Sequence, residues 1–306
     1  MEKSRCANCG AELAGPWCAQ CGERARKPGD LTIRKYLGEL LDALTNLEGR
    51  FWGSLRALMF KPGLLTADYL AGRRVRWMRP LHLFLLINLL YFFLTAWNTF
   101  TTELQWHIGA EGFLHQAVAS RLVNDKLNEP PLASEEWRQV TLSLLQPDRK
   151  LDEAQQDARG RLIDYARLFN SRVDIYSRTL IIIMIPLIML APLVLLALRR
   201  EGSIVHLVMA THWTAFFLLI SLVFGWLISL PFLLGWFTTD NIELQDLIAT
   251  VILMGLGFAW TLPAVRKVYQ LGWAKAVLLA AAINVWLIPA LMLYRAVLFF
   301  LVFWSV

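Results

Sequence analysis

The sequence predicts an all-α fold, a polytopic membrane helix bundle of about five transmembrane helices with a small N-terminal four-cysteine zinc knuckle. Three observations support this fold class. The chain is 57% hydrophobic and 18% charged, whereas an ordinary soluble domain is about 45–50% apolar and about 25% charged. The apolar excess lies in long runs after residue 80, and all four cysteines lie within the first 21 residues.

The cysteines form two C-x-x-C-G pairs, Cys6 with Cys9 and Cys18 with Cys21, separated by eight residues. Four thiolates bind Zn²⁺ tetrahedrally and leave no open coordination position, so the predicted zinc is structural. A reducing cytoplasm disfavours disulfides. The alternatives are unliganded thiols or a redox pair. We assign the knuckle to residues 1–28, where the metal would supply the folding energy that so short a segment lacks.

Residues 29–79 are predicted to form cytoplasmic amphipathic helices and a basic juxtamembrane turn. Apolar residues recur every three or four positions from Ile33 onward, which predicts a helix over 31–60, with a break at Gly49. This helix is expected either to lie on the membrane surface or to pack against the cytoplasmic ends of the spans. The run Lys61-Pro62-Gly63 then predicts a helix stop and a turn.

Four arginines precede the first span: Arg73, Arg74, Arg76 and Arg79. They predict either a positive-inside anchor or a site for a phosphate-bearing ligand, because guanidinium groups match phosphate oxygens.

Three histidines, His82, His206 and His212, are expected near the same membrane boundary. Ionisable groups at such depths are candidates for function. The histidines either converge with the arginines on a phosphate headgroup or form separate hydrogen bonds. His206 and His212 do not share a helix face, and no carboxylate lies close to them in sequence to complete a metal site.

A spanning helix needs about 20 mostly apolar residues. Five stretches meet this requirement: about 80–97, 179–198, 212–234, 247–265, and 276 to the C-terminus. The fifth contains Pro289 and Arg295. It is expected either as one kinked helix, with Arg295 snorkelling or facing the bundle, or as a span that ends near Tyr294 and continues as an interfacial tail.

Charge distribution predicts the topology. Residues 1–79 hold 14 Lys/Arg and 8 Asp/Glu, and the short loops at 199–200 and 266–275 are basic, whereas loop 235–246 has acidic residues and no Lys or Arg. The positive-inside rule therefore places the N-terminus in the cytoplasm and the C-terminus outside a bacterial inner membrane. The same asymmetry explains the net charge of +6 without a nucleic-acid partner.

Residues 98–178 would then be external. Short helices are expected around 111–124 and 135–145, and a long amphipathic helix from about Leu151 is expected to run into the second span. The segment contains no cysteine, so helix packing must hold it as a cap on the membrane. The remaining spans occupy 179–306.

Several motifs in combination resemble a known family. They are the two C-x-x-C-G pairs, Lys61-Pro62-Gly63, Tyr69-Leu70-x-Gly72-Arg73-Arg74 ahead of Pro80, Tyr176-Ser177-Arg178 and the stretch from His206 to His212. Together they resemble the bacterial zinc-ribbon membrane proteins grouped as domain of unknown function 3667. The resemblance covers most of the chain apart from the external segment. It implies the architecture and very little chemistry.

The sequence carries no serine-hydrolase, metalloprotease or nucleotide-binding signature, which favours a non-enzymatic protein. The leading hypothesis is a membrane protein that recruits or scaffolds a cytoplasmic partner through residues 1–79. The alternative is a flippase-like protein that binds or transports a lipid or lipid phosphate, holding an anionic headgroup with the arginine and histidine residues. A single cavity lined by Arg73, His82, His206 and His212 would favour the alternative.

Overall fold

The computed structural model describes residues 10–12, 15–20, 49–73, 76–95, 100–109, 113–129, 131–146, 148–199, 202–233 and 242–306, with backbone alone at 228–233 and 242–247. The chain divides into two units, 1–53 and 54–306.

In the N-terminal unit, Glu12 and Trp17 are isolated bridge residues, and the side chain of Cys18 is only 3% exposed. Cys6, Cys9 and Cys21 lie outside the described residues. Residues 31–48 of the predicted amphipathic helix lie outside them as well. From residue 49 to residue 60 the backbone is helical. The zinc knuckle therefore stays a prediction.

The larger unit, 54–306, is helical in every regular element that the structure describes. The predicted class, an all-α helical membrane protein, is confirmed, because four helical stretches are long and apolar enough to cross a membrane: Glu153–Leu195, Ser203–Leu227, Ile248–Tyr269 and Trp273–Ser305. The elements are α2 (Leu64–Leu70), α3 (Pro80–Leu94), α4 (Leu104–Gly109), α5 (Gln116–Leu127), α6 (Ser134–Leu145), α7 (Glu153–Leu180), α8 (Met184–Leu195), α9 (Ser203–Leu233), α10 (Ile242–Tyr269) and α11 (Trp273–Ser305), with 3₁₀ turns at Ile181–Ile183 and Ala197–Arg199.

Helix α3 is apolar but shorter than the four candidate spans. It begins at Pro80, a residue suited to the first helical position because its missing N–H would have no helical partner. Its 15 residues extend about 22 Å, less than the roughly 30 Å of a bilayer core. Phe84 and Ile87 are buried on its inner face, while Phe93 is 83% exposed on the outer face. A bilayer that accommodates α3 must therefore thin locally or use flanking residues to complete the span.

The third span starts earlier than the hydropathy pattern predicts. Helix α9 begins at Ser203 rather than at 212, and His206, Thr211 and His212 within its first turns are buried. Helix α9 packs against α2, α3, α8 and α10, and its first histidines contact Tyr269 and Thr66, so protein rather than lipid surrounds these polar groups. This packing permits polar residues that a hydropathy window leaves out of a span.

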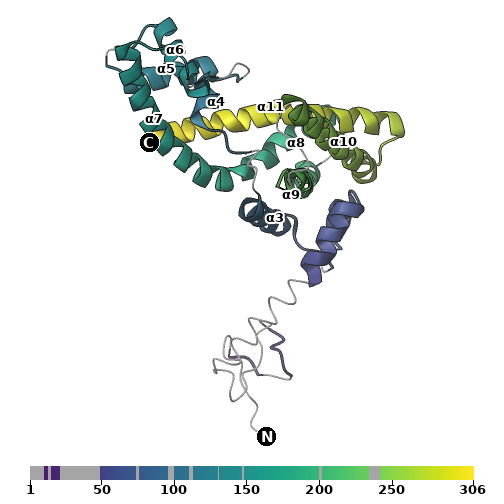
Figure 1. Cartoon of the computed structure of the whole chain (residues 1–306). Helices are drawn as coiled ribbons and strands as arrows, with labels where there is room; N and C mark the ends of the chain where they lie inside the picture. The colour runs from purple at the N-terminus through teal and green to yellow at the C-terminus, as the bar shows by residue number, and fades with distance from the viewer. Residues whose placement is uncertain are drawn as a thin grey trace. The chain divides into compact units, whose positions relative to one another are not determined.

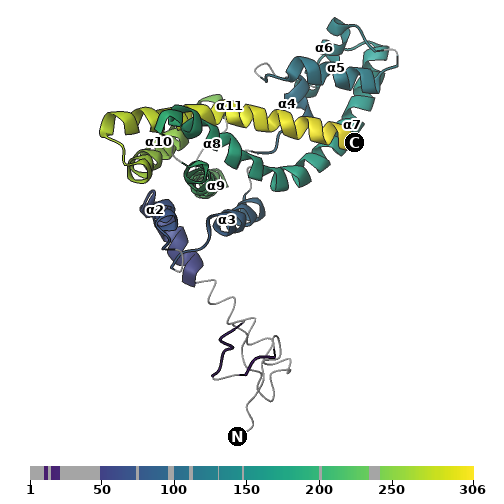
Figure 2. The ribbon, with the colours of Figure 1, turned by 180° about the vertical axis from the view of Figure 1, so that it is seen from behind.

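Helix α11 is one continuous helix of 33 residues through Pro289, about 50 Å long at 1.5 Å per residue. The helix continues past Tyr294 without a break, and where it leaves the membrane stays a prediction. In Figures 1 and 2, α11 runs from beside α10, past α8, to the middle of α7 near α4. Trp286 Nε1 donates to the Leu187 carbonyl (2.7 Å) and Tyr294 Oη to the Ser177 carbonyl (3.2 Å).

Helices α4 to α7, here called the cap, correspond to the segment expected outside the membrane. Helices α5, α6 and α7 lie close to the sequence-based expectations, whereas the short α4 was not expected. The cap packs through buried apolar side chains such as Val123, Val140 and Phe169. Lys126 Nζ also donates to the Phe303 carbonyl at 3.3 Å. The cap is therefore joined to the last turns of α11.

Basic residues gather at the C-terminal end of α10, on the side of the bundle here called the basic end. Arg199, in the connection between α8 and α9, donates through Nη1 to the Tyr269 carbonyl at the end of α10 (2.9 Å). Lys267 is close enough to act on the charge of Asp68 in α2. The two basic loops identified in the sequence thus lie at the same end of the bundle, as alternating spans require.

Candidate ligand-binding site at the basic end

Residues 54–70 are built into the bundle. Trp260 Nε1 of α10 donates to the Leu58 carbonyl at 2.6 Å, and the Thr66 hydroxyl lies 2.9 Å from His212 Nδ1 of α9. Gly63 makes the turn between them in a left-handed conformation, with φ of 73°. A Cβ at Gly63 would lie 2.9 Å from the backbone of Ala264. The Lys-Pro-Gly turn therefore seats α2 directly on the backbone of α10.

Asp68 holds the loop that joins α2 to α3. Its carboxylate accepts hydrogen bonds from Arg73 Nε (3.1 Å) and Nη2 (2.6 Å) and from Trp77 Nε1 (2.7 Å). Burial by itself raises the pKa of Asp68, but the hydrogen bonds from Trp77 and Arg73, with the charges of Arg73 and Lys267, outweigh burial and lower the pKa below its ordinary value. An ionised Asp68 thus fixes the entry into α3.

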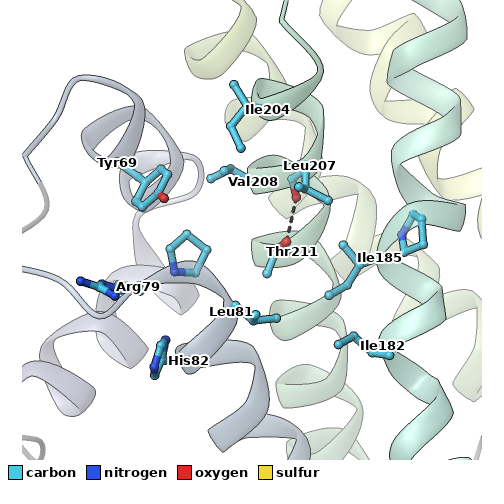
Figure 3. Close-up of a pocket in the computed structure, with 12 residues that line it drawn as sticks. Tyr69, Arg79, Leu81, His82, Ile182, Ile185, Ile204, Leu207, Val208 and Thr211 are labelled. Atoms are coloured by element: carbon cyan, nitrogen blue, oxygen red, sulfur yellow. Dashed lines mark hydrogen bonds between the residues drawn. The ribbon is translucent and has the colours of Figure 1, made fainter.

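Beside this loop lies a cavity of about 490 Å³ between α2, α3, α8 and α9. Figure 3 shows Tyr69, Arg79 and His82 on the α2–α3 side of the pocket, across from the apolar side chains of α8 and α9, with the Arg79 and His82 side chains directed away from those helices. Ligand pockets typically occupy about 300–1,000 Å³. The lining comprises Tyr69, Arg79, Pro80, Leu81, His82, Ile182, Ile185, Pro186, Ile204, Leu207, Val208 and Thr211.

The cavity is amphipathic. Arg79 and His82 are exposed at its polar edge, and Arg79 also precedes the first turn of α3. The free N–H groups and dipole of a helix N-terminus favour an anion at that position. The α8 and α9 side is apolar, with Thr211 Oγ1 donating to the Leu207 carbonyl within its own helix (2.8 Å). An anion at the edge and a hydrocarbon chain inside would both find suitable surroundings.

The predicted ligand-binding residues do not form one cluster. Arg79 and His82 share the cavity. Arg73 pairs with Asp68, and the guanidinium of Arg76 lies 4.6 Å from the centroid of the Trp77 ring. Arg74 lies outside the described residues.

The other two histidines have separate partners. His206 Nδ1 lies 3.0 Å from Tyr269 Oη, and His212 bonds Thr66 as described above. Both histidines are nearly inaccessible, at 1% and 2% exposure. They join α9 to α10 and to α2, which matches the sequence alternative of separate hydrogen bonds. Any ligand role for them stays a prediction.

Sequence reasoning missed the residues that complete the cavity and its support. Ile185 was taken as part of a predicted span and Thr211 as part of the stretch from His206 to His212, and Asp68 was not singled out. A signal was available for Asp68, which is the only acidic residue between Gly49 and Pro80 and lies five positions before Arg73. The cavity wall had no such signal, because apolar residues that face a cavity and those that face lipid look alike in sequence.

Within the part of the chain that the structure describes, no group of three or more His, Cys, Asp or Glu side chains could hold a metal ion. Since three of the four predicted zinc ligands lie outside that part, this finding does not bear on the knuckle.

Residues 48–92 match the family DUF3667, described as a protein of unknown function. This match confirms the resemblance to domain of unknown function 3667 over the segment that contains the Lys-Pro-Gly turn, the Asp68 loop and the start of α3. The chain finds no significant match among curated proteins or solved structures.

Proposed function

We propose that this multi-pass membrane protein binds an anionic amphiphile, a lipid or a lipid-linked phosphate, in the cavity beside Arg79 and His82. The observation that supports this proposal is the combination of about 490 Å³ of mainly apolar space with a cationic edge. The proposed ligand places its charged headgroup at Arg79, His82 and the N-terminus of α3, and its hydrocarbon chain between α8 and α9.

The chemistry of the edge suits a phosphate. A guanidinium can donate two parallel hydrogen bonds to phosphate oxygens. The first turn of α3 adds backbone donors at Leu81 and His82, whose N–H groups have no acceptor within the helix, while Pro80 itself has no N–H. Asp68 supports this edge indirectly. By holding Arg73 and Trp77 it fixes the loop from which Arg79 enters α3.

The proposed site would face the cytoplasmic leaflet of a bacterial inner membrane. The basic end carries the loops rich in Lys and Arg, and such loops stay in the cytoplasm. Anionic lipids are attracted to clusters of basic residues at that surface. This orientation also places the cap and the C-terminus on the external side.

A structural zinc bound by Cys6, Cys9, Cys18 and Cys21 is part of the proposal. The spacing of the two pairs supports it. Recruitment of a cytoplasmic partner by residues 1–79 stays a prediction, since no contact among the described residues favours it over ligand binding. The single cavity lined by Arg73, His82, His206 and His212 that would have favoured ligand binding does not form. The proposal rests instead on the cavity that Arg79 and His82 share.

Native mass spectrometry of the purified protein, titrated with phosphatidylglycerol, tests the proposal. Binding is expected to weaken at least tenfold in Arg79→Gln, which removes the charge at the cavity edge. It is also expected to weaken in Val208→Trp, which fills the interior. Arg76→Gln is the matched control, because Arg76 is exposed in the same loop but does not line the cavity.

Three results would overturn the proposal. One is equal binding by Arg79→Gln and Arg76→Gln, which would reduce Arg79 to a topology signal. Another is undiminished binding by Val208→Trp, which would place the bound lipid on the outer surface. The third is equal affinity for phosphatidylcholine, the zwitterionic comparison, which would exclude a headgroup site for anions.

A further inference from the structure

Two histidines of the cap contact each other where the cap meets α11. His107 Nδ1 of α4 and His115 Nε2, just before α5, are 2.8 Å apart and share a hydrogen bond. The rings are 0% and 6% exposed. Four aromatic residues surround them: Phe113, Phe169 of α7, and Phe299 and Phe300 of α11. The first three have ring centroids 5.2–6.1 Å from that of His107, and the Phe300 centroid lies 6.1 Å from that of His115. The pair is thus buried in an aromatic cage formed by the cap and α11.

This arrangement depends on proton occupancy. One nitrogen of the contact must donate and the other must accept, so the hydrogen bond exists only while at least one ring is neutral. Adding a second proton would set two N–H groups against each other at 2.8 Å. It would also place two cations in an aromatic cage with little access to water, where charge is poorly solvated.

Neighbouring groups add little to stabilise a charged pair. From α11, the Arg295 guanidinium acts on His107 as a further cation and lies 5.5 Å from the Phe113 centroid. The other ionisable side chain of that part of α11, Tyr294, bonds Ser177. The backbone of Thr102 is the one group that favours the charged form of His107 among those acting on it.

Several other ionisable groups of the cap have partners or positions away from the pair. On α7, Asp164 and Asp174 pair with arginines of their own helix, Arg167 and Arg178, and the neutral Tyr165 faces the cation of Lys126 from α5. Glu103, ahead of α4, is exposed. Along α5, Arg121 and Asp125 border a separate surface pocket between α5 and α6. The charged side chain that acts on the histidine pair is therefore the cation of Arg295.

The pKa values agree with this geometry. Burial, the neighbouring His115 and Arg295 together lower the pKa of His107 to about 3. Burial also lowers the pKa of His115. Both rings are therefore neutral in the docked cap at neutral pH.

We propose that the His107–His115 pair is a proton-binding site that releases α4 and α5 from α11 when the cap side of the membrane becomes acidic. The docked cap excludes the second proton, while a released cap exposes both rings to water and binds it. Protons therefore shift the equilibrium towards release. This inference does not depend on the proposed lipid cavity, which lies at the opposite end of the bundle.

The sign and size of the effect follow from linkage. A histidine whose pKa is lowered in the docked state stabilises docking fully above its ordinary pKa of about 6.5 and loses that contribution as the pH falls. Each pH unit below 6.5 raises the released fraction about tenfold for each histidine that is protonated only on release. Between pH 7.5 and pH 5.0, His107 alone gives roughly a 30-fold increase, and His115 adds to it.

Hydrogen–deuterium exchange of the full-length protein in lipid nanodiscs tests this proposal. Rates are measured at pH 7.5, 6.5, 5.5 and 5.0 and are divided by the intrinsic exchange rate at each pH. Amides of α4 and α5 are expected to lose protection at least 30-fold between pH 7.5 and 5.0, whereas those of α10 are not. The double variant His107→Phe/His115→Phe, which has no titrating ring in the cage, is expected to keep its protection.

Two further variants keep the test informative if the double variant does not fold. His115→Gln can still share a hydrogen bond with His107 but removes one titrating group, so it is expected to lower the steepness of the pH dependence. His82→Gln removes an exposed histidine at the other end and is expected to behave as the wild type. Unchanged protection of the wild-type cap between pH 7.5 and 5.0, or an equally steep loss in His115→Gln, would overturn the proposal.

Discussion

Replacing Gly63 by alanine probes the seating of α2 on α10. Gly63 has φ of 73° and its missing Cβ would lie 2.9 Å from both Cα and O of Ala264. A left-handed backbone costs an alanine about 1–2 kcal/mol. Overpacking against backbone atoms, which cannot rotate away, adds about 1–3 kcal/mol. We therefore expect Gly63→Ala to destabilise the docked segment by about 2–5 kcal/mol.

Gly72→Ala is the matched control. Gly72 also has a left-handed backbone, with φ of 80°, but nothing lies within 4 Å of its missing Cβ. This variant should therefore show the backbone cost alone, about 1–2 kcal/mol. The difference between the two variants isolates the contact with Ala264.

The assay is thermal unfolding in detergent, followed by the tryptophan fluorescence of the purified protein, together with hydrogen exchange over residues 57–70. Gly63→Ala is expected to lower the unfolding midpoint more than Gly72→Ala and to raise exchange in α2. Equal midpoints, with no change of exchange in α2, would refute the close seating of the Lys-Pro-Gly turn on α10.

Three other changes give distinct results. Asp68→Asn is expected to destabilise the protein by about 1–2 kcal/mol at pH 7, because the hydrogen bond to Arg73 loses its charge. Since the pKa of Asp68 is lowered on folding, the difference in stability from the wild type should shrink as the pH falls through that pKa. A difference that does not change with pH would contradict the role given to the Asp68 charge. Trp260→Phe leaves the Leu58 carbonyl without its donor and should lower the unfolding free energy by about 1–3 kcal/mol, measured by denaturation in mixed micelles. Cys18→Ser should remove one Zn²⁺ per chain in elemental analysis, and an equal zinc content would exclude the four-cysteine site.

The spans could be predicted because hydropathy is a local property of the sequence. The start of α9 could not, because the partners that let His206 and His212 lie inside a helix are Tyr269 and Thr66, distant in sequence. Charge patterns predicted that the basic loops share one end of the bundle, and the Arg199 contact with Tyr269 agrees with this.

The candidate site was predictable only in part. Arg79 and His82 could be named because charged and titratable residues next to a span stand out in sequence. Their separation from Arg73 could not be foreseen, because it results from a competing partner, Asp68. The histidine pair of the cap was likewise not identified, since His107 and His115 gain significance only through the aromatic residues that α7 and α11 bring to them.

The docking of residues 54–70 has a consequence for biogenesis. Leu58 meets its partner Trp260 across a sequence separation of 202 residues. At a synthesis rate of 5–20 residues per second, the ribosome needs roughly 10–40 s to supply that partner. During this interval the segment must be sheltered by the lipid surface or by another protein. The segment that matches the family is therefore synthesised well before the helix on which it packs. A truncation after α9 would remove Trp260, and residues 54–70 could then not dock on α10.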